Sequence, residues 1–437
     1  MNTRFSGENA YKHLVKMAGE LPHRNSGSDN ERKAAAYIKE YFESIGLKTW
    51  TQTFEVETGV AVTEKVVLNG EDIQCKALPL AGSTGPEGVE GELYFVQSVV
   101  EEYVTPEMDG KILLTQGYYR KGIELLNKHR PLAVINIGRS GSSKLSHGWG
   151  TASLREKYGP MPTVNILYED GLRLLDHVGS KVKVVADIKE EKAESLNVVG
   201  ELTGVEKPDE IIIIGGHYDS VPDEPGAADN AAGTAIAMEL ARIYKEAGSK
   251  RTLRFMAWGS EEIGCKGSEH DVNRLKKDDD SKGDEKTELD KVRLVINVDV
   301  QGARLGTNTS AAMGPSELAA SVKLLAKETG LLINMGGGGG GISNGIYSSD
   351  GTSYSAVGVP SLNFIRGGTK GIHSSWDTIE WLHPEGLDTN GVFIERFIER
   401  YCNEAVVFPF ERKIPEDQQK NLEKYYKGKM QKPPGSE

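Results

Sequence analysis

The spacing of apolar residues in the first 58 positions predicts two helices followed by a strand. Apolar side chains recur at helical intervals over residues 11–18. A second helix is predicted from Ser28, which forms a capping-box pattern with Glu31, to Gly46, a residue type that commonly ends helices. Apolar and polar residues then alternate over residues 50–56, which indicates a strand with one buried face. We interpret residues 1–58 as the first part of a layered domain.

Residues 59–180 follow a different pattern and predict an inserted β-rich domain. Short apolar runs at residues 93–96, 112–114, 133–137 and 162–167 are separated by clusters of Gly, Ser and Pro. Alternation of apolar and polar residues returns at residues 181–188, so the first domain is expected to resume there.

Residues 181–410 predict the main part of the first domain, in which strands alternate with helices. The continuous apolar run Ile211–Ile214 is typical of a central strand that is covered on both faces. A helix is expected from about residue 230 to 247, and further strands are expected at residues 252–258, 294–300 and 361–365. This alternation predicts an α/β fold with a mainly parallel sheet sandwiched by helices. Residues 411–437 are rich in charge and are expected to form a charged C-terminal tail.

Length and charge narrow the possible classes of protein. A chain of 437 residues is long for one hydrophobic core and comfortable for two domains. Its 52 basic and 64 acidic residues give a net charge of -12, which argues against nucleic acid or an anionic membrane as the main partner. The composition indicates no oligomeric state.

The cysteines and the N-terminal residues bear on the compartment. Cys75, Cys265 and Cys402 are odd in number and have no metal-ligand spacing, so a disulfide framework is not expected. The N-terminus has no apolar signal core, and no run of residues reaches membrane-spanning length. We therefore expect a cytoplasmic protein, although a trimmed secreted form would show the same features.

Acidic and histidine residues lie just beyond the carboxyl ends of the strands predicted in the main domain. They are His217, Asp219, Asp229, Glu261, Glu262, Asp299 and His373. Because parallel strands end at one edge of a sheet, five separate segments would bring these side chains together.

A set of histidine and carboxylate ligands without thiolate suits zinc, cobalt or manganese in an open catalytic site. More than three such ligands indicate two ions, which Asp229 could bridge. Taken singly, Glu261 and Glu262 could be an exposed acidic pair, and Asp229 could be a helix cap. Asp299 resists such a structural interpretation best, because a charge at the end of an apolar strand is costly unless it is paired or metal-bound.

The segments around these residues resemble the co-catalytic zinc aminopeptidase family, which also includes glutamate carboxypeptidase II and the transferrin receptor ectodomain. The segments are Gly-Gly-His217-Tyr-Asp219, Ala-Ala-Asp229-Asn, Ser-Glu261-Glu262-Ile-Gly, Asn-Val-Asp299 and Ile-His373-Ser-Ser-Trp-Asp. The resemblance covers about residues 197–407 and implies a fold of the zinc exopeptidase type. Residues 59–180 look like a protease-associated domain.

The resemblance implies a role for each of these residues. His217 and Asp299 would complete one zinc site, Glu262 and His373 the other, and Asp229 would bridge the two zinc ions. Asp219 would orient the ring of His217, and Glu261 would be the general base for the water that bridges the metals. The resemblance also implies a cis peptide bond after Asp229.

One position departs from a common form of the family pattern. Many members have a tyrosine directly before the last histidine, where it stabilises the oxyanion, and this chain has Ile372 there. Tyr347 and Tyr354 flank Asp350 in the same part of the sequence, but the resemblance assigns the role to neither.

The leading hypothesis is a di-zinc metallo-aminopeptidase, with cobalt or manganese as possible substitutes, that removes N-terminal residues from peptides with a free N-terminus. A related di-metal carboxypeptidase or other amide hydrolase is the alternative. A carboxypeptidase for acidic C-terminal residues would need a basic cluster, and Arg366 and Lys370 lie before His373. A non-catalytic, receptor-like binding module is the alternative of another class, and loss of metal ligands would mark it.

Overall fold

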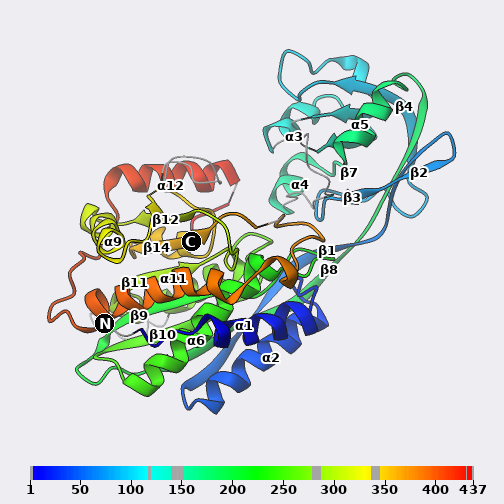
Figure 1. Ribbon diagram of the computed structural model, residues 1–437. Helices are drawn as coiled ribbons and strands as arrows, with labels where there is room; N and C mark the ends of the chain where they lie inside the picture. The colour runs from blue at the N-terminus through cyan, green and yellow to red at the C-terminus, as the bar shows by residue number, and fades with distance from the viewer. Residues whose placement is uncertain are drawn as a thin grey trace. The chain divides into compact units, whose positions relative to one another are not determined.

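In the computed structural model the chain forms two compact units. Residues 3–116, 120–138, 145, 152–277, 287–335, 345–369, 371–429 and 431–435 are described. The first unit comprises Met1–Val56, Glu194–Ile372 and Trp376–Glu437, and the second comprises Glu57–Ala193 and His373–Ser375 (Figure 1). The second unit extends beyond the predicted insertion of residues 59–180, because strand β8 runs without interruption from residue 181 to residue 202.

The first unit contains a mixed, mainly parallel sheet. Its strands, in order across the sheet, are β13 (Ile333–Asn334), β12 (Asn308–Met313), β14 (Ser361–Arg366), β11 (Val292–Val298), β9 (Lys207–His217), β10 (Arg251–Trp258) and the end of β8 (Lys181–Leu202). Strands β14, β11, β9 and β10 are parallel neighbours, whereas β12 and β8 run antiparallel to β14 and β10. The α/β class and the main strands expected from the sequence are therefore confirmed.

Both faces of this sheet are covered, which explains its continuous apolar strands. On β9, Ile212 and Ile214 pack into one hydrophobic core, while Ile211 and Ile213 pack into another. Because successive residues of a strand point to opposite faces, a strand buried on both sides needs apolar residues at every position.

The helices of the first unit supply the side chains that complete the two cores. Towards Ile212 and Ile214 lie α1 (Gly7–Leu14), η1 (Val15–Glu20), α2 (Asp29–Ser44), α6 (Ala232–Ala247), α9 (Ser316–Thr329), α11 (Pro384–Phe397) and η5 (Ile398–Asn403). Towards Ile211 and Ile213 lie α7 (Lys266–Lys277), α8 (Glu288–Lys291) and α10 (Gly351–Ser355). Shorter elements are η3 (Ala227–Ala231) and η4 (Ile379–Trp381).

The predicted start of α2 is confirmed, with one difference in its hydrogen bonds. Ser28 caps the helix by accepting a hydrogen bond from the Glu31 amide. The Glu31 carboxylate accepts hydrogen bonds from the amide of Gly27 and the hydroxyl of Ser195. Glu31 therefore links the helix to β8.

The second unit contains both strands and helices. Its strands are β1 (Lys48–Leu68, shared with the first unit), β2 (Glu71–Ile73), β3 (Cys75–Ala77), β4 (Val89–Val96), β5 (Ile112–Thr115), β6 (Ala133–Ile137), β7 (Thr163–Ile166) and the start of β8. Strands β4 to β7 are parallel neighbours in sequence order. The helical elements are α3 (Arg120–Leu126), α4 (Ala152–Tyr158), α5 (Tyr168–Leu175) and η2 (Pro106–Met108). The prediction found the four parallel strands but missed these helices, whose two turns are too short to show a clear periodicity.

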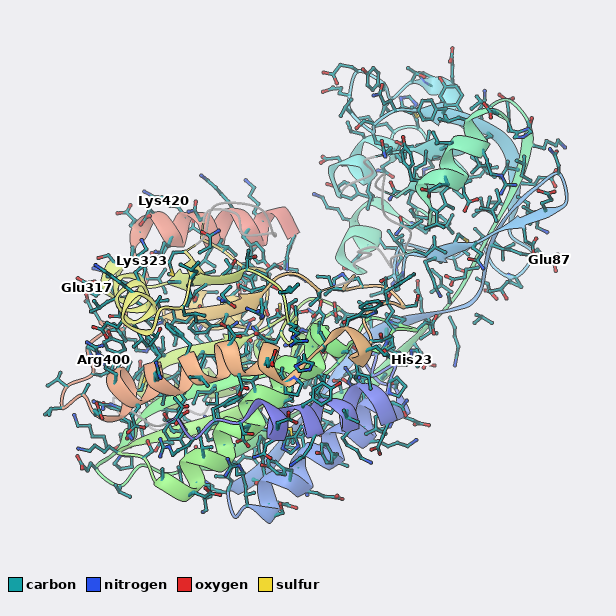
Figure 2. All side chains as sticks on the ribbon, in the orientation of Figure 1. His23, Glu87, Glu317, Lys323, Arg400 and Lys420 are labelled. Atoms are coloured by element: carbon teal, nitrogen blue, oxygen red, sulfur yellow. The ribbon has the colours of Figure 1, made fainter. Side chains whose placement is uncertain are left out.

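The C-terminal residues fold into a helix, whereas the sequence suggested a charged tail. Helix α12 (Glu416–Lys429) buries Leu422 and Tyr426 against Met313 and Ile346. Side chains four positions apart lie on one face of a helix, so two buried residues suffice for a narrow apolar stripe. The other residues are mostly charged and exposed, such as Lys420, which points away from the unit (Figure 2).

The structure shows the state of the three cysteines and the character of the helices. Cys75, Cys265 and Cys402 are buried free thiols. None of the helices in the described part of the chain combines the length and apolar character needed to cross a bilayer.

Candidate metal centre

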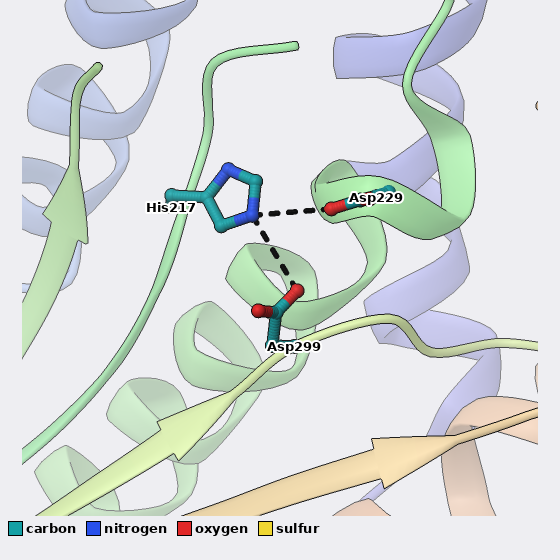
Figure 3. Close-up of side chains that lie close together, drawn as sticks. All are labelled: His217, Asp229 and Asp299. Carbon is teal, nitrogen blue, oxygen red and sulfur yellow. Dashed lines mark ion pairs between the residues drawn. The ribbon is translucent and has the colours of Figure 1, made fainter. Parts of the chain in front are cut away.

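Three of the predicted residues meet at the carboxyl ends of β9 and β11. His217 Nε2 lies 3.2 Å from Asp229 Oδ1 and 3.4 Å from Asp299 Oδ1 (Figure 3). His217 is the last residue of β9, Asp229 lies in η3, and Asp299 directly follows β11. All three side chains are buried, so the cluster forms a group of potential metal ligands with little access to water.

A second group of potential ligands shares Asp229 with the first. Ligand atoms of Asp229, Glu262 and His373 all lie within 4.8 Å of one another. Glu262 is buried in the turn after β10, and the partly exposed His373 follows β14 with a left-handed backbone. The structure thus brings all five predicted ligands together in two groups with a common carboxylate.

The local backbone explains why these strand ends can approach so closely. A Cβ atom at Gly216 would lie 2.6 Å from the carbonyl oxygen of Val298, so only glycine fits between β9 and β11. Asn230 donates a hydrogen bond of 2.9 Å to the same carbonyl and so ties η3 to the end of β11. The peptide bond between Asp229 and Asn230 is cis, as the resemblance implied.

Asp219 connects His217 to the turn that follows β10. Its Oδ1 lies 3.4 Å from His217 Nδ1, on the side of the ring away from Asp229. Its two carboxylate oxygens also accept hydrogen bonds from the backbone amides of Glu261 (3.0 Å) and Glu262 (3.2 Å). Asp219 is fully buried. Through these contacts it positions His217 of the first ligand group and Glu262 of the second.

Glu261 lies beside the two groups and belongs to neither of them. Its side chain is buried, and its Oε1 accepts a hydrogen bond of 3.3 Å from the thiol of Cys265. Burial raises the pKa of Glu261 well above its usual value; the charge of His217 lowers it, and those of Glu262 and Asp299 raise it further. A buried carboxyl group beside the ligands is a candidate general base.

The first group of ligands fits a zinc ion on two observations. Two ligand atoms at about 2.0–2.1 Å from a tetrahedral zinc lie about 3.3 Å apart, and the two distances at His217 Nε2 match this spacing. In addition, His217 Nε2 and Asp299 Oδ1 lie within ion-pair distance of each other but make no hydrogen bond of good geometry among the described residues. Buried polar atoms normally have hydrogen-bond partners, so a cation between these atoms would satisfy both.

The charges around His217 support the same assignment. Burial by itself lowers the pKa of His217, but the carboxylates of Asp219, Asp229 and Asp299 together raise it well above its usual value. The negative charge that holds a proton on His217 also attracts a metal cation. The nitrogen and oxygen donors of this group are ligands that zinc accepts.

The structure adds three residues to the site that the sequence did not assign. Tyr347 is largely buried; burial raises its pKa well above the usual value, and the nearby charges of Asp299 and Asp229 raise it further. Asp377 accepts hydrogen bonds from the amides of Ala228 and Asp229. Cys265 donates to Glu261. Asp377 lies in the segment after His373 that resembles the family, and Tyr347 was one of two tyrosines noted near Asp350, whereas Cys265 had no signal in the sequence.

Tyr354, the other tyrosine near Asp350 in sequence, does not lie at the site. Its hydroxyl donates to Asp271 Oδ2 (2.7 Å) and accepts from Trp258 Nε1 (3.1 Å) in the core beneath β10. Ile372, which stands where many family members have tyrosine, is 38% exposed. Tyr347 is therefore the tyrosine closest in its electrostatic surroundings to the candidate metal ligands.

Comparisons with known proteins agree with this geometry. Residues 197–398 match the model of Peptidase family M28. Aminopeptidase YwaD of Bacillus subtilis is 26% identical over 408 residues, which cover 89% of this chain and 83% of that protein. Human Carboxypeptidase Q is 27% identical over 281 residues, 59% of this chain and 60% of that protein. The solved structure of BSAP, a zinc aminopeptidase from Bacillus subtilis, covers 95% of this chain and all of its own at 24% identity with a TM-score of 0.75, which shows a common fold.

The matched residues 197–398 contain both groups of ligands as well as Asp219, Glu261 and Asp377. The order of the strands and the five ligands at their carboxyl ends therefore agree with the match of residues 197–398 to Peptidase family M28.

Proposed function

We propose that this chain is a metallo-aminopeptidase that uses two divalent cations, zinc by preference, to remove N-terminal residues from peptides. The observation that carries the proposal is the pair of ligand groups that share Asp229. His217 and Asp299 would hold one ion, Glu262 and His373 the other, and Asp229 both. The resemblance of the whole chain to an aminopeptidase supports this choice among the hydrolases.

Side chains around the ligands have separate roles in the proposed reaction. When bound, two divalent cations lower the pKa of water and polarise a carbonyl group. Glu261, which is buried beside the ligands and belongs to neither group, takes a proton from the attacking water and returns it to the leaving amine. Asp219 keeps the ring of His217 in place, since its carboxylate faces Nδ1 of that ring.

We propose Tyr347 as the side chain that stabilises the oxyanion, because the charges of Asp299 and Asp229 act on its hydroxyl. Its raised pKa keeps the hydroxyl protonated, so the group can donate a hydrogen bond to a developing negative charge. Ile372 cannot do so. Tyr347 thus takes the part that a tyrosine before the last histidine would play in many relatives.

The excess of carboxylates at the site favours substrates with a free N-terminus. Five acidic side chains lie around two histidines: Asp219, Asp229, Glu261, Glu262 and Asp299. Two bound divalent cations would offset most of this negative charge, and the charge that remains attracts a protonated α-amino group rather than the carboxylate of a C-terminal residue.

A carboxypeptidase is the second candidate, because Carboxypeptidase Q is among the relatives. An acidic C-terminus would need a basic group at the site. The guanidinium of Arg366 donates to Ala303 O, Asn308 Oδ1 and Arg304 O, so its donors are already engaged. Lys370, the other basic residue before His373, lies outside the described residues. A receptor-like binding module is disfavoured because all five ligands and Glu261 are present.

One experiment distinguishes these three functions. The metal content of the purified chain is measured together with hydrolysis of one peptide in free, N-acetylated and C-amidated forms. We expect about two ions per chain, loss of most turnover on acetylation and little effect of amidation. Loss on amidation instead would favour the carboxypeptidase, and bound metal without turnover of any peptide would favour the binding module.

A further inference from the structure

Arg24 is a buried arginine whose side chain contacts the loop between two metal ligands. It precedes α2, and no part of it is exposed. Its nitrogens donate to five backbone carbonyls, those of Tyr218 (2.7 Å), Met17 (2.9 Å), Leu21 (3.3 Å), Pro225 (2.7 Å) and Gly226 (2.7 Å). Three of these carbonyls belong to the loop that joins His217 to Asp229.

The partners of Arg24 are unusual for a buried guanidinium. Burial lowers its pKa to about 10, while the charges of Asp219 and Asp377 raise it, so the group is a cation at neutral pH. Among the described residues it makes no ion pair with a carboxylate. A buried charge is costly unless hydrogen bonds compensate it, and here backbone carbonyls of the loop provide most of them. The conformation of the loop and the burial of Arg24 therefore depend on each other.

The backbone of Arg24 holds the same loop. Its amide donates to Ser220 Oγ (3.0 Å), and its carbonyl accepts from the Ser220 amide (3.3 Å). Gly226 closes the loop with a left-handed backbone, and a Cβ atom there would lie 2.4 Å from Ser220 Cβ and 3.1 Å from Arg24 Nη2. The loop is thus closed tightly around the guanidinium.

Asp377 accepts hydrogen bonds from the backbone amides of residues 227–229, which follow Gly226. Its carboxylate accepts from the amides of Ala228 (2.8 Å) and Asp229 (3.0 Å), and its carbonyl accepts from the amide of Ala227 (3.0 Å). Arg24 binds the carbonyls of residues 225 and 226, and Asp377 binds the amides of residues 227–229. The backbone that leads into the shared ligand is therefore held at five consecutive residues.

We propose that Arg24 is a positioning residue that fixes Asp229 relative to His217 and thereby sets the affinity for the two ions, with Asp377 acting from the other side. The inference rests on the proposed metal site but does not concern the choice of substrate. Neither residue is among the metal ligands, and both act through the backbone of residues 217–229. The loss of either contact should therefore weaken metal binding before it affects peptide binding.

The test compares Arg24→Lys with Arg251→Lys in the full-length chain. Arg251 is also fully buried and donates to two backbone carbonyls, those of Cys402 and Ala405, but it begins β10 at the end remote from the ligands. Lysine keeps the charge but cannot reach several carbonyls at once. Zinc affinity is measured by competition with a chromogenic chelator, and unfolding of the metal-free chain by circular dichroism.

We expect Arg24→Lys to weaken zinc binding by about 10–100-fold, the range seen when groups that orient metal ligands are lost. Its kcat should fall, its KM should stay within about 3-fold, and excess zinc should restore part of the rate. Arg251→Lys should lower the stability of the metal-free chain and leave zinc affinity unchanged. Asp377→Asn, which removes one of the two acceptors for backbone amides, should weaken zinc binding in the same direction.

The outcomes separate this inference from the proposed function. If the unchanged chain binds no zinc, the proposed function fails first. If it binds zinc and Arg24→Lys does so equally well, the positioning role is overturned and the proposed function stands. Equal losses of affinity in Arg24→Lys and Arg251→Lys would also overturn it, because general destabilisation would explain both. If Arg24→Lys does not fold, Asp377→Asn decides, and unchanged zinc affinity in that variant overturns the proposal.

Discussion

Strand β10 has buried charged side chains near both of its ends. The charges at one end are paired within the protein, whereas those at the other end are not. At the amino end, Arg251 lies 2.6 Å from a carboxylate oxygen of Glu210, and Arg254 lies 2.6 Å from Glu201 and from Glu288. Each guanidinium there has a carboxylate from a neighbouring segment. This end of the strand is a structural ion-pair cluster that is complete within the chain.

At the carboxyl end, the acidic groups outnumber the basic ones. Glu261 and Glu262 follow β10, and Asp219 accepts hydrogen bonds from their backbone amides. The buried cation nearby, Arg24, donates to carbonyl oxygens and pairs with no described carboxylate. The balance of charge at this end therefore calls for cations from solution, which a buried site of nitrogen and oxygen ligands can bind.

The difference shows how a structural cluster of charges can be told from a functional one. Buried ion pairs that are complete within the protein need no ligand, whereas a surplus of one sign, held in place by further hydrogen bonds, points to a bound partner of the other sign. Substitutions at each end of β10 test this difference.

The largest effect is expected for Asp229→Ala, because this residue belongs to both groups of ligands. Metal content should fall from about two ions per chain to less than one, and kcat/KM should fall by at least about 10³-fold, since metals stabilise transition-state charge by several kcal/mol. Elemental analysis and peptide hydrolysis measure both. The matched change at the other end, Glu210→Gln, removes a partner of Arg251 and should lower only stability. A loss of metal in Glu210→Gln would mean that the two ends are not independent.

The adjacent glutamates should differ in how their loss acts. Glu262 is within a group of ligands and Glu261 is not. Glu261→Gln cannot accept a proton, so kcat should fall by about 10²–10⁴-fold with metal content unchanged. Glu262→Gln should weaken one metal site, and added zinc should restore some activity. If Glu261→Gln loses a metal ion and Glu262→Gln does not, the two roles are reversed.

A smaller effect is expected for Tyr347→Phe. If its hydroxyl stabilises the oxyanion, kcat should fall by about 10²–10³-fold while metal content and KM change little. Tyr354→Phe is the control, because among the described residues that hydroxyl bonds Asp271 and Trp258 in the core and none of the ligands. It should lower stability by about 1–3 kcal/mol, the cost of leaving buried polar partners unpaired, and leave kcat unchanged. Equal rates in Tyr347→Phe and the unchanged chain would exclude the oxyanion role.

Much of the fold and of the ligand set could be predicted from local sequence. The run Ile211–Ile214 is typical of a doubly covered strand, which the structure confirms, and parallel strands end at one edge of a sheet. Residues after such strands must therefore lie near one another, which is why the positions of His217, Asp229 and Asp299 along the chain suffice to group them.

The remainder depended on contacts between distant residues. Arg24 reaches Pro225 and Gly226, some two hundred positions away, and no local pattern marks such a contact. Helix α12 was missed because Leu422 and Tyr426 make too narrow an apolar stripe among charged residues. The second unit ends within β8, which continues across that point without a turn, so no local pattern marks its end.

Two buried histidines extend the comparison to the rest of the first unit. Three carboxylates raise the pKa of His217 well above its usual value against the effect of burial. His13, in α1, has no such group: burial lowers its pKa to about 4, and the charge of Lys12 lowers it further. Its Nδ1 hydrogen-bonds the hydroxyl of Tyr37 at 2.6 Å, and the ring of Tyr41 packs against it. His13 is therefore buried in its neutral form.

The smallest effect follows from this lowered pKa and concerns stability alone. Because the folded pKa of about 4 lies below the unfolded value of 6.5, the unfolded chain takes up a proton first as the pH falls. Stability from His13 is therefore complete above pH 6.5 and is lost between pH 6.5 and 4, by about 2 kcal/mol at pH 5. His13→Gln does not titrate and can still bond Tyr37, so its stability should fall less between pH 7.5 and 5. Urea unfolding of both proteins at these two pH values measures the difference, since all other titrating groups are common to them. If both proteins lose the same free energy of unfolding between pH 7.5 and 5, His13 is not held in its neutral form and the contrast with His217 fails. Peptide hydrolysis at pH 7.5 should be the same in the unchanged chain and in His13→Gln.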